Sequence, residues 1–285
     1  MRTADDRGRG DARLVLTCEH ASAFVPPAFA SLFAGDRAVL ATHRGFDAGA
    51  LDVARSLARR LRAPLVAGAT TRLLVDLNRS PHNPAIFSRW TRPLPSARRA
   101  ALLARFHAPH WRRVERLLDA AERPVVHVAV HSFTPKLGRD VRDFEIGLLY
   151  DPRRPRERAF ADRLREALRA HPTELRIRRN APYRGTSDGL TTAQRERRRA
   201  RDYLGLELEL NQAILRTPAA RRRVAAAIAD ALQAALCASP RQVGSTRSAR
   251  ATRFARAARA ARAAGASPRR TRSRSAPARA RDAKR

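Results

Sequence analysis

The 285-residue chain is poor in cysteine, lysine and long apolar runs, and each shortage excludes a class of protein. Two cysteines, Cys18 and Cys237, supply neither a disulfide framework nor a CxxC metal-binding motif. No apolar run reaches the roughly 18 residues of a transmembrane helix, so we expect no membrane partner. The N-terminal residues lack the apolar centre of a signal peptide, which predicts a cytoplasmic protein.

Lysine is nearly absent, although the net charge is +33. Lys136 and Lys284 are the only lysines among 59 basic residues, and the abundance of arginine and alanine is typical of a GC-rich genome. The charge is also uneven, because the segment from Arg241 to Arg285 holds 14 arginines, one lysine and one aspartate. A high positive charge favours nucleic-acid binding, but here we expect at most weak, non-specific contact through this C-terminal segment.

Composition divides the chain into three parts. Residues 239–285 are rich in Arg, Ala and Ser and have almost no large apolar side chain, so this tail is predicted to be disordered. Residues 1–12 are predicted to be a flexible N-terminus. No linker interrupts residues 13–238, which predicts one folded domain.

Strand-like and helix-like segments alternate through that domain. This alternation predicts the α/β class, with a single mixed sheet covered by helices on both faces. We expect strands at 13–17, 63–68, 71–77, 125–133, 144–151, 174–178 and 204–210, and helices at 48–61, 96–122, 156–170, 190–203 and 217–236.

Polar residues follow several of the expected strands, where the sites of α/β proteins form. Each position also has a structural interpretation: Asp47 as a helix N-cap, Asp76 and Asn78 as turn residues, and Glu207 with Glu209 as the solvated face of an edge strand. Two histidines with carboxylates at successive strand ends nevertheless fit a zinc site, where imidazole and carboxylate are the expected ligands. The residues concerned are Glu19, His20, Asp76, Asn78, Arg79, His131, Ser132, Glu207 and Glu209, together with His43 and Asp47 just before the helix expected at 48–61. Cys18 lies inside its strand and is expected to be a small buried residue, although a thiol site is the alternative.

Seven short motifs occur in an order that resembles the N-formylglutamate amidohydrolase family. They are CEHASAFVP, HRGFDAGALDVARSLA, TRLLVDLNRS, HSFTP, IGLLYD, NAPYRG and LELELNQ, and they span about residues 14 to 215. The EHASAF, HSFTP and IGLLYD elements resemble the broader branch of the family. The resemblance therefore implies amide hydrolysis more specifically than it implies one substrate.

The resemblance also implies a fold related to zinc-dependent exopeptidases and a divalent metal, expected to be zinc. The matching positions imply that His20, Asp47 and His131 hold the metal and that Glu209 is the catalytic base. His43 remains an alternative ligand to Asp47 because it lies four positions away.

The resulting hypothesis is a metal-dependent hydrolase of a small N-acylated amino acid, such as N-formylglutamate. Arg79 and Arg184 are candidates to bind the substrate carboxylate, because a guanidinium can contact a carboxylate through two hydrogen bonds. The alternative is a basic protein that binds nucleic acid or an anionic surface on an inactive hydrolase scaffold.

Overall fold

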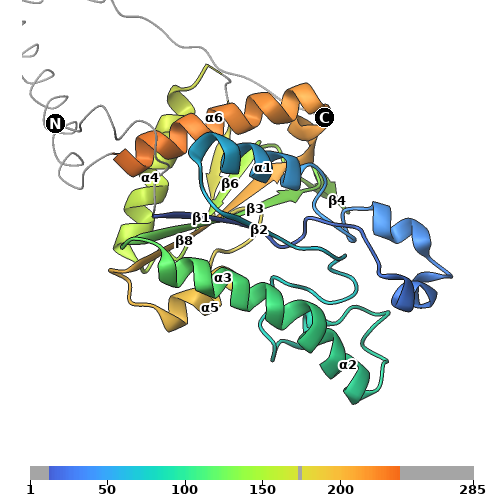
Figure 1. Ribbon diagram of the computed structural model, residues 1–285. Coiled ribbons are helices and arrows are strands. Elements are labelled where there is room, and N and C mark those ends of the chain that lie inside the picture. Colours follow the sequence, from blue (N-terminus) through green and yellow to red (C-terminus); the bar gives the residue numbers. More distant parts are fainter. Residues whose placement is uncertain (1–12, 173–174, 238–285) are drawn as a thin grey trace, which may run out of the picture. The chain divides into compact units, whose positions relative to one another are not determined.

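The computed structural model describes residues 13–172 and 175–237, which belong to one compact unit. The predicted flexible N-terminus (1–12) and the predicted disordered tail (239–285) lie outside the described residues. Figure 1 shows a central sheet with helices on both of its faces.

Six strands form the sheet: β1 (Leu14–Cys18), β2 (Leu65–Ala67), β3 (Val125–Phe133), β6 (Ile146–Leu149), β7 (Ile177–Arg179) and β8 (Tyr203–Asn211). Their order is β2-β1-β3-β8-β6-β7. β1, β2, β3 and β8 run parallel, whereas β6 is antiparallel to β8 and parallel to β7. The predicted single mixed sheet is therefore confirmed. A separate two-stranded hairpin consists of β4 (Lys136–Leu137) and β5 (Asp140–Val141).

Helices cover both faces of this sheet, as predicted (Figure 1). One face carries α1 (Ala50–Leu61), α4 (Pro155–Ala170) and α6 (Pro218–Cys237). The other carries α3 (Ala108–Ala120) and α5 (Leu190–Arg197). The remaining helical segments are α2 (Ser96–Leu102), the π turn η5 (Leu103–His107) and the 3-10 segments η2 (Pro27–Phe33), η3 (Arg37–Ala41), η4 (Pro84–Ile86) and η6 (Gln212–Leu215).

The alternation of side chains along β3 and β8 separates an apolar face from a polar one. Every residue of these two strands is buried. Residues 126, 128 and 130 of β3 and residues 204, 206, 208 and 210 of β8 are aliphatic and pack in the core under α1, α4 and α6. Because successive strand residues point to opposite faces, His127, His131, Glu207 and Glu209 point to the α3 and α5 side. The chemistry-bearing residues of both strands therefore share one face.

The predicted strand at 71–77 is wrong, because this segment is a series of turns. Its amide groups donate to scattered carbonyls, from Thr71 to Phe24, from Arg72 to Gly45 and from Asp76 to Ile86. The aliphatic residues of the segment are buried in two small clusters beside the sheet. The apolar pattern of this segment therefore indicates that its side chains are buried, but it does not indicate a strand.

The single helix predicted at 96–122 is interrupted by the π turn η5. Pro109 follows two residues later, near the start of α3. Proline has no amide hydrogen, and its ring clashes with the carbonyl four residues earlier in an α-helix. The wider π turn relieves this conflict and lets the chain continue along nearly the same path.

Candidate active site

The site lies where β1, β3 and β8 end on the α3 and α5 side of the sheet. Glu19 and His20 directly follow β1, and His131 lies near the end of β3. In the parallel pairing of β3 with β8, His131 is the register partner of Glu209 and Ala129 is the partner of Glu207. Side chains of register partners project from the same face, so His131 and Glu209 are neighbours across the sheet.

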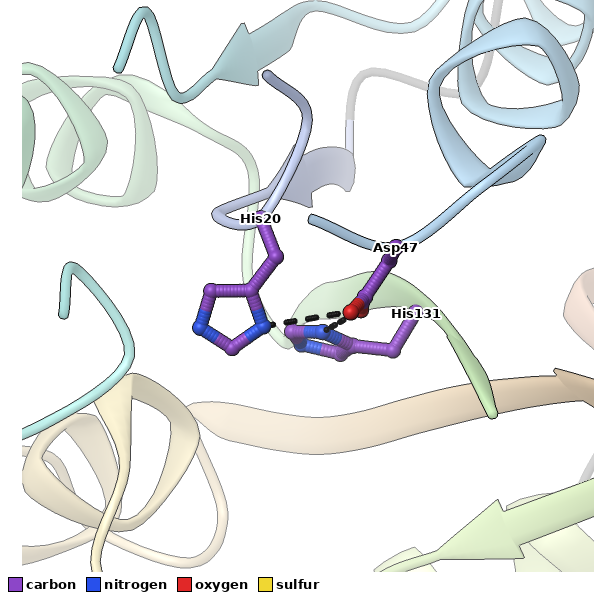
Figure 2. Close-up of side chains that lie close together, drawn as sticks. All are labelled: His20, Asp47 and His131. Atoms are coloured by element: carbon purple, nitrogen blue, oxygen red, sulfur yellow. Dashed lines mark hydrogen bonds and ion pairs between the residues drawn. The ribbon is translucent and has the colours of Figure 1, made fainter. Parts of the chain in front are cut away.

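His20, Asp47 and His131 form a compact buried cluster. One ligand atom from each of the three side chains lies within 4.8 Å of the other two. Asp47 Oδ2 lies 3.0 Å from His131 Nδ1 and 3.5 Å from His20 Nδ1. Figure 2 shows the two imidazole rings beside each other, with one ring nitrogen of each joined by a dashed line to this carboxylate. These are the three residues predicted to hold a metal.

Backbone hydrogen bonds hold Asp47 in place. Its amide donates to the carbonyl of His20 at 2.9 Å, and the amide of Ser132 donates to Asp47 Oδ2 at 3.2 Å. Asp47 is not the N-cap of α1, because Gly49 occupies that position with φ of 79°. The N-cap interpretation of Asp47 is therefore wrong, and its side chain belongs to the cluster.

An outer carboxylate accompanies each histidine of the cluster. Asp76 Oδ1 lies 2.7 Å from His20 Nε2, and Glu19 Oε2 lies 3.0 Å from His131 Nε2. Asp76 also accepts a hydrogen bond from the Asn78 amide, so its predicted turn role is real but not its only role. Each histidine thus has one ring nitrogen near Asp47 and the other near an outer carboxylate, an arrangement typical of metal-binding histidines.

Electrostatics in the cluster favour a bound cation. Burial opposes ionisation of Asp47, Asp76 and Glu19, but nearby positive groups outweigh it and lower all three pKa values, that of Glu19 to about 2. Burial opposes a charge on His131 as well, but the hydrogen-bonded carboxylate of Asp47 and the negative charge of Glu19 beside Nε2 raise its pKa well above the usual value. A metal that binds His131 must displace its proton, after which three carboxylates against the guanidinium of Arg72 leave two negative charges. A divalent cation would neutralise them.

Glu209 differs from the other carboxylates of the site. Burial, together with the negative charges of Asp47 and Glu207, raises its pKa to about 8. Glu207 accepts a hydrogen bond from the hydroxyl of Thr191 in α5. Because β8 lies between β3 and β6 and is fully buried, the edge-strand interpretation of these two glutamates is wrong.

Gly147 permits the backbone to approach Glu209 closely. It is the register partner of Glu209 on β6. A Cβ atom at this position would lie 1.9 Å from the carbonyl oxygen of Ala181 and 3.2 Å from Cβ of Glu209. A side chain here would therefore displace the wall of the site.

A cavity of about 320 Å³ opens beside the cluster. Glu207 and Glu209 line it, as do the two predicted substrate-binding residues, Arg79 and Arg184. Arg79 donates a hydrogen bond to the carbonyl of Asp188 at 2.9 Å, whereas Arg184 is exposed at the rim. The volume suits a small metabolite, and the arginines give the cavity positive groups facing its anionic end.

Some residues of the site were not assigned by sequence reasoning. Arg72 lines the cavity and lies 2.8 Å from Asp76 and 3.7 Å from Asp47. It follows Thr71 in the motif TRLLVDLNRS, which was the available signal.

His43, the alternative ligand, lines the cavity but is exposed and lies outside the buried cluster. Cys18 is buried in the apolar core, as expected.

The site combines a buried His/Asp cluster, a carboxylate with a raised pKa and an adjoining cavity, which are features expected of a catalytic site. The family model of N-formylglutamate amidohydrolase matches residues 12–216. The chain therefore belongs to the N-formylglutamate amidohydrolase family, and the family supports amide hydrolysis as its chemistry.

Among the solved structures that resemble the chain are two with TM-scores above 0.5. The Atu2144 gene product of Agrobacterium tumefaciens is 30% identical with a TM-score of 0.69, and the match covers 80% of this chain and 91% of that one. An N-formylglutamate amidohydrolase from Ralstonia eutropha JMP134 is 16% identical with a TM-score of 0.57, covering 80% and 94%. The second likeness bears on the fold alone. No curated protein matches the chain. Of the helices in the described residues, none combines the length and apolar character needed to cross a membrane.

Proposed function

We propose that this chain is a divalent-metal-dependent amidase, with zinc as the metal, that hydrolyses a small N-acyl amino acid such as N-formylglutamate. The observation that carries the proposal is the convergence of His20, Asp47 and His131 beside Glu209 in one cavity. Membership of the amidohydrolase family supports the reaction class.

The donor atoms of the cluster fit a zinc ion. His20 Nδ1 is buried without a hydrogen-bond partner, and the Nδ1 atoms of both histidines face the same oxygen of Asp47. Two imidazoles and one carboxylate form a set of three protein ligands, as in many catalytic zinc sites. When bound, such an ion supplies Lewis-acid activation of the carbonyl and acidifies water.

Glu209 is the proposed general base. Its Oε2 atom is buried without a hydrogen-bond partner among the described residues, so it is free to accept a proton from water. The same oxygen can then deliver that proton to the amine as the amide bond breaks. A pKa of about 8 favours a group that both takes and returns a proton near neutral pH.

Arginines are proposed to orient the substrate. Arg79 and Arg184 line the cavity and are candidates to bind the substrate carboxylate. Arg72 contacts two carboxylates of the cluster from the wall of the same cavity. It is the candidate to stabilise negative charge on the carbonyl oxygen during attack.

The alternative, a basic binding protein on an inactive scaffold, draws its main support from the charge of the C-terminal segment. That segment lies outside the described residues. No contact in the described residues favours it over hydrolysis, so we do not propose it.

A substrate screen tests the proposal. Full-length protein, stripped with a chelator and then reloaded with one equivalent of zinc, is assayed against a panel of N-formyl and N-acetyl amino acids. We expect hydrolysis of at least one acidic member only after reloading. His131→Ala is the matched control, because it removes one proposed ligand from the same cavity. Absence of both stoichiometric zinc binding and hydrolysis in the unmodified chain would refute the proposal.

A further inference from the structure

Glu19 is a buried carboxylate that the proposed reaction does not use directly. It follows β1, and its side chain is 0% exposed. Within the described residues its Oε2 forms an ion pair with His131 Nε2, but neither oxygen makes an aligned hydrogen bond. Burying a carboxylate without strong hydrogen bonds costs stability, so a purely structural role gives this residue little advantage.

The charged neighbour of the Glu19 carboxylate is the imidazole ring of His131. Glu19 Oε2 lies 3.0 Å from His131 Nε2, while the opposite ring nitrogen, Nδ1, lies 3.0 Å from Asp47. An imidazole that presents a lone pair at Nδ1 must carry its proton at Nε2. A carboxylate accepts hydrogen bonds and donates none when ionised, so Glu19 selects this tautomer.

The hydrogen-bond partners of His127, on the same face of β3, differ from those of His131. His127 Nε2 lies 2.9 Å from the Thr17 hydroxyl and His127 Nδ1 lies 2.8 Å from the Tyr203 hydroxyl. Both ring nitrogens of His127 therefore have ordinary neutral partners. His131, two strand repeats further on, has carboxylates at both nitrogens instead.

We propose that Glu19 is a positioning residue for metal binding: its carboxylate accepts the Nε2 proton of His131 and so directs the Nδ1 lone pair at the metal position beside Asp47. The inference rests on the proposed metal-dependent function. An outer carboxylate of this kind also fixes the ring orientation and strengthens the histidine as a ligand. Glu19 has no contact with the substrate cavity in this role.

The test compares zinc affinity in full-length Glu19→Gln and unmodified protein, measured by competition with a chromophoric chelator. The amide is isosteric but can donate to Nε2 and so favour the unproductive tautomer. We expect zinc affinity to fall about 10–100-fold. The visible spectrum of the cobalt-loaded variant should also shift, because the ligand at Nδ1 is held differently. Tyr203→Phe is the matched control, since it removes one buried hydrogen bond from the same face without touching the cluster; its zinc affinity should stay within about twofold.

Each outcome decides the inference. Glu19→Gln that binds zinc within twofold of the unmodified protein would overturn it while leaving the proposed function intact. A Tyr203→Phe variant that loses as much affinity as Glu19→Gln would overturn it too, because the effect would then be a general disturbance of the sheet. If Glu19→Gln does not fold, Glu19→Asp replaces it, and we again expect weaker zinc binding. Failure of both variants to fold would assign Glu19 to the fold and overturn the inference. No zinc binding by the unmodified chain would defeat the proposed function itself.

Discussion

Replacing Glu209 with glutamine should separate catalysis from metal binding. Glu209 is the register partner of His131, whereas Glu207 is the partner of Ala129 and lies about 6–7 Å further back along the strand. Glu207 is also held by the hydroxyl of Thr191. Glu207→Gln is therefore a matched control, because it makes the same chemical change on the same face of the same strand.

The size of the effect follows from the role of a general base. Loss of such a group typically lowers turnover by about 10²–10⁴-fold, which corresponds to about 3–5 kcal/mol of transition-state stabilisation. We expect Glu209→Gln to keep stoichiometric zinc and to lose this factor in kcat. Glu207→Gln should lose far less. The measurements are metal content of both variants and steady-state kinetics with a substrate identified by the panel.

The pH dependence gives a second readout of the same residue. Burial raises the pKa of Glu209 to about 8, and a base acts only when ionised. The value of kcat/KM should therefore increase with pH up to about 8 and fall as the pH drops below it. This dependence should be absent from the residual activity of Glu209→Gln. Loss of zinc from Glu209→Gln would make Glu209 a ligand, and full activity in both glutamine variants would refute the mechanism.

Three further predictions concern the metal, the tail and the stability of the sheet. His20→Ala and His131→Ala should each fold but lose stoichiometric zinc by metal analysis, and a full zinc complement in either variant would exclude that residue as a ligand. Truncation after Pro240 should preserve the circular dichroism spectrum and hydrolysis, because the predicted site residues all precede it; an insoluble or inactive product would contradict this. Burial lowers the pKa of His127 to about 4, so the unfolded chain binds more protons between pH 6.5 and 4. The free energy of unfolding should fall by up to about 3 kcal/mol over that range, and His127→Gln should reduce this slope in chemical denaturation.

The strands that carry the site were predictable because local pattern and tertiary burial agree there. The segment 125–133 is rich in β-branched residues and forms β3 with the same bounds. In 204–210, leucines alternate with glutamates, and the resulting strand β8 has leucines in the core and glutamates in the site. The second pattern has period two, which a strand places on separate faces.

Segments where tertiary contacts override local preference were not predictable. Residues 71–77 have strand-like composition, but three of their amides donate to three separated segments of the chain, and no local signal specifies such partners. The π turn at Leu103–His107 depends on how the helix accommodates Pro109 while it packs on the sheet. In both segments the apolar residues predict which side chains are buried, but they do not predict the backbone conformation that buries them.

The candidate site also has features that the sequence predicted and features that it did not. Two histidines and nearby carboxylates at strand ends indicated a metal site, and the family resemblance assigned Asp47, which a local pattern could not separate from an N-cap. The contacts of Glu19 with His131 and of Asp76 with His20 join residues far apart in the chain, so only the folded arrangement brings them together. A useful signal was nevertheless present: in two fully buried strands, the polar residues recur at every second or fourth position, as in His127 with His131. A solvated edge strand can carry such a row without cost, but a central strand cannot, because each buried polar side chain must have a partner or a function. A polar row in a strand expected to be central therefore predicts a partner or a function for each of its members: His127 has two hydroxyl partners, and His131 lies in the site.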